Sequence, residues 1–335
     1  MLQSISFYFV VGPLLLMFFC SSQVFAQDMF RDLMAPPGKA KTTIGYKAST
    51  EPGMSSESVS NPRQDQSFSF ATPVYQDQKN QYMVGWNWSD LHLDTDQKLA
   101  DGSNIPNDFY NSQLSVGWKH NEDKERFWRT SVSYGSASDH LFDSHRTSTL
   151  SVTGLYSASK DPTSRWVWFL NYSNNRVFLN NIPFPGFAYI YMPSPDFIGL
   201  FGIPFVFIKK NWDWRWSTDA VIGPFLGHAD LSYSLIERSL IEISQIYLAF
   251  DSIPQTFYRA ARTDEDSQLF VTQSKLVLGY KQTIASRLFV NLYGGLAFDR
   301  SVDERKGFKY SSSSIERFEN RWILGAELKL TLPGS

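Results

Sequence analysis

The sequence predicts an all-β protein: an antiparallel transmembrane β-barrel of about 14 strands, with 12 as the second count, preceded by a cleaved signal peptide. Three observations support this prediction: an apolar leader, apolar residues that alternate with polar ones, and connections that alternate between short and long. The 335 residues carry a net charge of -2, and only 19% are charged while 16% are aromatic. This composition excludes disordered, collagen-like and polybasic nucleic-acid-binding proteins, so no nucleic acid is expected as a partner.

The leader covers residues 1–26. Residues 5–19 are almost wholly apolar, and Ala26 supplies the small residue that signal peptidase requires. An uncleaved membrane anchor is the alternative, because residues 1–6 contain no Lys or Arg. Cleavage would remove Cys20, the single cysteine, so the exported chain would form no disulfide, as suits a bacterial envelope protein. We expect residues 27–41 to form a periplasmic N-terminal segment and residues 42–332 to form the barrel.

Alternation with a period of two runs through the rest of the chain and places successive side chains on opposite faces of a strand. Tryptophans show it best, because seven of the ten fall in spaced sets within segments that we expect to be strands. A membrane barrel places such aromatic residues outside, at the two lipid interfaces. The predicted girdle residues are Trp86, Trp88, Trp118, Trp128, Trp166, Trp168, Trp212, Trp214, Trp216 and Trp322.

Further segments show the same pattern. Apolar residues alternate with polar ones over 114–119, 128–134, 150–158, 288–298 and 318–332. Segments of about 9 to 13 residues have the length that crosses a bilayer when tilted. A secreted β-sandwich or propeller is the alternative for an alternating sequence, but its exposed face would be mostly charged.

Connections between these segments give a second argument. Short polar turns at 76–80, 121–124, 160–164 and 283–286 are expected in the periplasm, and longer stretches at 51–65, 94–108, 138–146 and 300–314 outside the cell. Residues 182–208 are poor in charge but contain five prolines, which excludes a membrane-spanning helix. Residues 182–204 could fold across the barrel mouth as a constriction or form one bent strand between loops.

Polar residues on the other face of the strands are expected to line a lumen. The candidates carry both signs of charge and are Asp213, Arg215, Asp219, Lys275, Lys281, Asn291, Glu327 and Lys329. Mixed charge suits either a water-filled pore of modest selectivity or a lumen closed by salt bridges.

Several short stretches resemble an uncharacterised family of bacterial outer-membrane β-barrel proteins, mainly in the C-terminal half. They are residues 182–191, 196–197, 202–205, 262–266, 276–279 and 294–300. The resemblance implies an outer-membrane barrel and supplies no catalytic or binding residues.

Sets of acids and histidines suggest chemistry only weakly. Asp143, Ser144 and His145, together with Asp94 and Asp96, resemble the catalytic groups of the surface proteases called omptins, but such spacings are common in solvated loops. Residues 94–102 miss the known calcium-loop spacing, and the other histidines show no metal-ligand spacing. We therefore predict no cofactor, no metal and no enzymatic activity.

The predicted function is that of a passive channel for small polar solutes. A structural or surface-interaction barrel is the second class, and an outer-membrane hydrolase is the third. The expected partners are outer-membrane lipid, the barrel assembly machinery and the solutes themselves.

Overall fold

A computed structural model describes residues 40–332 except 53–61, 100–101, 124, 178, 225, 237–243, 263, 286 and 307–314. The predicted signal peptide, Cys20 and most of the predicted periplasmic segment lie outside the described residues. Among the residues that the structure describes, no helix is long and apolar enough to cross a membrane.

The described residues form 18 strands and one short 3₁₀ helix, η1 (His145–Thr147). The first nine strands are β1 (Thr42–Thr50), β2 (Arg63–Gln76), β3 (Asn80–Leu93), β4 (Asp108–Asn121), β5 (Arg126–Ser138), β6 (Ser148–Asp161), β7 (Ser164–Ser173), β8 (Phe184–Ser194) and β9 (Phe197–Ile203). The others are β10 (Val206–Asn211), β11 (Trp216–Gly223), β12 (Leu226–Ser234), β13 (Ser244–Ser252), β14 (Gln255–Phe257), β15 (Ser267–Ile284), β16 (Leu288–Lys306), β17 (Ile315–Phe318) and β18 (Arg321–Leu332).

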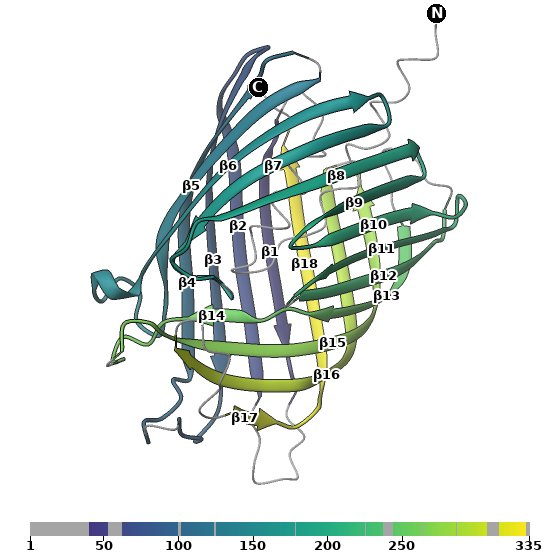
Figure 1. Cartoon of the computed structure of the whole chain (residues 1–335). Coiled ribbons are helices and arrows are strands. Elements are labelled where there is room, and N and C mark those ends of the chain that lie inside the picture. Colours follow the sequence, from purple (N-terminus) through teal and green to yellow (C-terminus); the bar gives the residue numbers. More distant parts are fainter. Residues whose placement is uncertain are drawn as a thin grey trace, which may run out of the picture.

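These strands form one closed antiparallel barrel (Figure 1). Closure occurs where β1 pairs with both β2 and β18. Strands β13 and β14 pair with successive parts of β15, and β17 and β18 with successive parts of β16, so each of these two pairs fills one position in the ring. The described strands therefore occupy 16 positions, which corrects the predicted 14 and the second count of 12.

Part of the difference in strand count comes from the proline-rich stretch, which forms the hairpin β8–β9. Pro185 lies beyond the β8–β9 ladder, and Pro193 lies where its register shifts. Proline is tolerated at such positions because they require no ladder hydrogen bond from its nitrogen. Both sequence-based alternatives for residues 182–204, a constriction across the mouth and one bent strand, are wrong. The strands that follow, β10 and β11, have only 6 and 8 residues, which made them hard to separate by pattern.

The outer face of the barrel is apolar, as the alternation predicts. Exposed side chains include Leu114 and Val116 on β4, Val132 and Tyr134 on β5, and Val152 on β6. A closed barrel with an apolar exterior excludes the soluble sandwich and propeller and confirms the outer-membrane type of fold.

The connections divide between the two ends of the barrel. Residues 77–79, 122–123, 125, 162–163, 285 and 287 lie at the end where β1 begins and β18 ends, which we call the turn end. Residues 51–52 and 62, 94–99 and 102–107, and 139–147 lie at the opposite, loop end. One predicted loop is partly wrong, because residues 300–306 continue strand β16.

An aspartate accepts hydrogen bonds from following backbone N–H groups in several turn-end connections. Asp77 accepts from Lys79 and Asn80 at 2.7 and 2.6 Å. Asp123 accepts from Glu125 and Arg126, and Asp213 accepts from Arg215 and Trp216. Such Asx turns hold the chain reversal in place.

We expect the turn at Asp77 to loosen in acid. Hydrogen bonds from the Asn80 and Lys79 amides and from the Tyr75 hydroxyl lower the pKa of Asp77 to about 2. A lowered pKa means that the stabilisation is present above the ordinary value of 3.8 and is lost as the pH falls towards 2. The protection of the Lys79 and Asn80 amides, measured relative to their intrinsic exchange rates, should therefore fall over this window, whereas the protection of the Val84 amide within β3 should not change. Unchanged protection at Lys79 would contradict the assignment.

Three inward-facing aromatic rings lie over glycines of the next strand. Phe169 covers Gly186, Tyr247 covers Gly279 and Tyr293 covers Gly325, and each pair is directly opposed in the ladder. A Cβ atom on any of these glycines would collide with the ring.

Gly325→Ala is expected to lower the free energy of unfolding by about 1–3 kcal/mol, because the Tyr293 ring must leave its position. The control is Gly154→Ala on β6, where an added Cβ meets nothing within 4 Å. Urea unfolding in lipid vesicles at fixed lipid concentration measures both. Equal stability of the two variants would show that the ring position is not constrained.

Candidate functional site: the polar half of the lumen and its covered mouth

The inner surface of the barrel has an apolar half and a polar half. The apolar half belongs to β5–β10, whose inward side chains pack into one buried cluster. Its members are Phe127, Leu155, Val167, Phe169, Ala188, Ile190, Ile198, Leu200, Phe205 and Phe207. The polar half belongs to β11–β18 and β1–β2. The cavity described below lies along the polar half.

One row of directly opposed residues crosses the polar half, and we call it the charged row: Lys281 on β15, Asn291 on β16, Glu327 on β18 and Lys47 on β1. The Asn291 amide donates to Glu327 at 3.5 Å and its oxygen accepts from the Tyr247 hydroxyl at 2.9 Å. The row therefore brings donors and acceptors together over four adjacent positions of the ring.

Acids on β11–β13 meet the cations of the charged row and its neighbours. Lys281 Nζ lies 2.5 Å from Asp230 Oδ2. The His228 ring lies between two carboxylates, with Nδ1 2.6 Å from Asp251 and Nε2 3.3 Å from Asp219. These pairs satisfy charges that would be costly to bury alone.

A cavity of about 140 Å³ lies along the polar half. Its walls include Lys47, Asp65, Asp251, Lys275 and Glu327. Lys275 Nζ lies 3.8 Å from Asp65 Oδ2, so these two charges of opposite sign are paired on the cavity wall. Both signs of charge face the same space.

The eight predicted lumen residues divide into two groups. Asp219, Lys275, Lys281, Asn291, Glu327 and Lys329 occupy inward positions on strands. Asp213 and Arg215 lie in the turn-end connection between β10 and β11 and are exposed, so the prediction for these two needs correction. The reason is the Asx turn described above, which uses Asp213 as an acceptor.

The predicted girdle tryptophans face outward on strands, with two exceptions. Trp212 and Trp214 lie in the same turn-end connection as Asp213. Eight of the ten are exposed, and Trp88 and Trp118 are half-buried at outward positions. Their contact with lipid stays a prediction.

The residues considered for chemistry lie at the loop end. Asp143, Ser144 and His145 belong to the connection between β5 and β6, and Asp94 and Asp96 to that between β3 and β4. Within the described part of the chain, no group of three or more His, Cys, Asp or Glu side chains is arranged to hold a metal ion.

A segment bridges the loop end of the barrel, and we call its described residues, 255–262 and 264–268, the cover. Strand β14 lies eight ring positions from β5, so the two belong to opposite walls. Nevertheless Tyr258 N donates to Ala137 O at 2.8 Å, and Ala260 N donates to Asp139 Oδ1 at 2.7 Å. The cover therefore spans the mouth (Figure 1).

The cover is anchored by packing and by charge. The rings of Phe257 and Phe109 lie 4.9 Å apart in a buried apolar cluster. Arg259 is 2.8 Å from Glu304 on β16, and the exposed pair Arg146–Glu265 is 3.0 Å apart. The cover could not be predicted from the sequence, since contacts between opposite walls leave no periodic signal.

No protein-family model matches the chain, and no curated protein matches it. Among solved structures it is similar to the Pseudomonas putida toluene transporter TodX, with 9% identity, a TM-score of 0.36, and 89% of this chain and 90% of that chain covered. It is also similar to an outer-membrane channel from Pseudomonas putida F1, with 6% identity, a TM-score of 0.35, and 88% and 97% covered. LpxR from Salmonella typhimurium has 5% identity, a TM-score of 0.31, and 86% and 99% covered. The assignments below rest on this chain's own residues.

Proposed function

We propose that the chain is a passive channel for small polar solutes in a bacterial outer membrane. The observation that carries the proposal is the polar half of the lumen, where charges of both signs line a cavity behind an apolar outer wall. The loop end faces the outside, because outer-membrane barrels place short turns in the periplasm. Lipid surrounds the outer wall, the tryptophans form its girdles, and the barrel assembly machinery inserts the exported chain.

The cover favours a second candidate, a structural barrel without an open pore. A segment bonded to both walls obstructs the loop-end mouth. A channel requires the cover to move away from the loop-end mouth, whereas in a structural barrel the cover stays across the mouth. We assign no catalysis in either case, and Asp143 and His145 take no part in transport.

Ion selectivity in a planar bilayer tests the channel. Lys329→Gln removes an inward positive charge, so the reversal potential in a salt gradient should shift towards greater cation selectivity. Arg215→Gln removes the same charge from the turn and should leave selectivity unchanged. Both variants are measured in a background with the cover shortened, so that closed episodes do not hide the effect. Conductance with identical selectivity in both variants would contradict a path along the polar half.

A further inference from the structure

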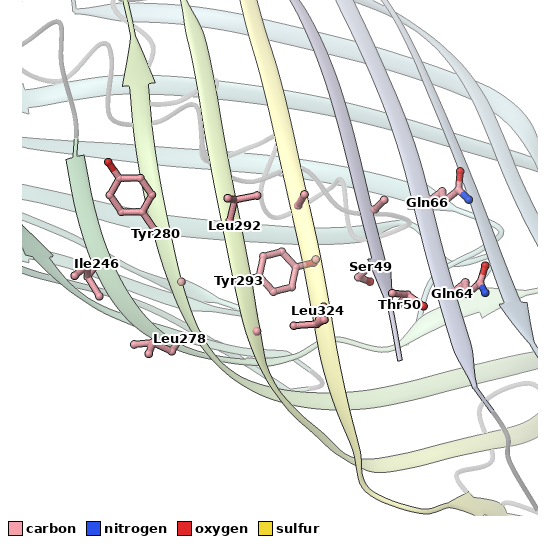
Figure 2. A pocket seen from close by; sticks show the side chains of 15 residues that line it. Ser49, Thr50, Gln64, Gln66, Ile246, Leu278, Tyr280, Leu292, Tyr293 and Leu324 are labelled. Carbon is pink, nitrogen blue, oxygen red and sulfur yellow. The ribbon is translucent and has the colours of Figure 1, made fainter. Parts of the chain in front are cut away.

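A shallow groove of about 730 Å³ runs across the outer wall over β13, β15, β16, β18, β1 and β2 (Figure 2). Leu278, Leu292 and Leu324 line it and are 61, 53 and 55% exposed. Its volume lies within the range of roughly 300–1,000 Å³ that is usual for small-molecule sites.

Small residues at the centre of two opposed rows create the groove. The first row is Ile246, Tyr280, Leu292, Ala326, Ala48 and Gln66, and the second is Leu278, Gly294, Leu324, Thr50 and Gln64. Ala326, Ala48 and Gly294 leave the space that large side chains on both sides enclose. An apolar trough on the outer wall offers an acyl chain a complementary apolar surface.

The rows become polar where they continue onto β3 and β4. Gln66 opposes Asp90, and Gln64 opposes His92, which is paired with Asp108 at 2.6 Å. Asp90 Oδ1 is buried and accepts no hydrogen bond from any residue that the structure describes. Side-chain amides and imidazole donate to and accept from hydroxyl groups, and carboxylates accept from them, so this end of the groove suits a sugar.

We propose that the groove binds one glycolipid of the outer leaflet. An acyl chain lies along Leu278, Leu292 and Leu324, and the sugar headgroup is hydrogen-bonded by Gln64 and Gln66. The proposal rests on the orientation given under the proposed function, because these polar residues lie at the loop end of their strands.

Native mass spectrometry of the folded, delipidated barrel with added lipid A tests the proposal. Gly294→Leu fills the groove and should weaken binding by about tenfold or more, corresponding to about 1.4 kcal/mol. Ala326→Leu should act in the same way, so the result does not depend on one variant. Gly154→Leu is the matched control, since this outward glycine lies in open space on β6. Heat-modified migration on a gel verifies that each variant is folded.

Phosphatidylethanolamine serves as the second probe because it has acyl chains but no sugar. It should bind at least about tenfold more weakly than lipid A, and Gln64→Leu with Gln66→Leu should remove that preference. Equal binding of lipid A to wild type and to both filled variants would overturn the site, and equal affinity for the two lipids would overturn the glycolipid. Failure of the channel proposal would instead appear as silent bilayers with lipid A binding intact.

Discussion

Shortening the cover is expected to turn a mostly silent barrel into one that shows frequent conductance steps. The variant replaces residues 258–266 with a short Gly-Ser linker, which removes the donors of Tyr258 and Ala260 that reach the opposite wall. Strand β14 and the start of β15 can still pair across such a linker, since Phe257 already opposes Leu269. Single-channel recording in a planar bilayer measures the open probability.

A disulfide provides the opposite test of the cover. Ala260 N lies 2.7 Å from Asp139 Oδ1, so Ala260→Cys with Asp139→Cys should lock the cover to β5. Cys20 lies in the predicted signal peptide, which leaves the exported chain with no other cysteine. The oxidised variant should stay silent, and the reduced one should conduct at least as often as wild type, because Asp139→Cys also removes the acceptor of the Ala260 N–H. A folded, shortened variant that remains silent would favour the structural barrel.

The strands were predictable wherever a complete alternating run crosses the wall. The alternation correctly predicted that Leu114, Val116 and Trp118 face outward. This was possible because β4 has 14 residues and therefore contains several complete periods. The count was not predictable, since β10 has 6 residues and the β8–β9 hairpin contains prolines at positions without ladder bonds. Short strands do not complete enough periods to separate them from turns.

The candidate site was predictable one strand at a time. Lys281, Asn291 and Glu327 follow from alternation, and the ladder places them in one row. Asp213 also fits an alternating pattern, between Trp212 and Trp214, although it closes a turn. His228, Asp230 and Asp251 occupy inward positions on β12 and β13, but their importance arises from contacts between strands, which no single strand reveals.

Glu51→Ala is expected to lower the free energy of unfolding by about 3–5 kcal/mol, the usual cost of breaking a buried ion pair. Glu51 Oε2 lies 2.5 Å from Arg300 Nη2, and the two side chains are 1 and 3% exposed. Glu51 also accepts from the Arg63 amide at 3.2 Å and from the Gln273 side chain. It thus joins the loop-end parts of β2, β15 and β16.

Glu51→Gln should cost less than Glu51→Ala. Burial raises the pKa of Glu51 above its ordinary 4.5 despite the nearby Arg300 and Arg63, so the fold accepts a neutral group at this position. For a carboxyl group with a raised pKa, stability falls as the pH rises from 4.5 to the folded-state pKa and is level above it. This dependence should vanish in Glu51→Gln. Urea unfolding in vesicles measures the stability of each variant. The same measurement on Arg300→Met and on the double variant Glu51→Leu with Arg300→Met separates the energy of the ion pair from the contribution of each side chain alone. The double variant replaces the ion pair by an apolar pair of similar volume and so removes the buried charge. If it is as unstable as Glu51→Ala, the stability lost in Glu51→Ala comes from packing and not from the buried charge of Arg300.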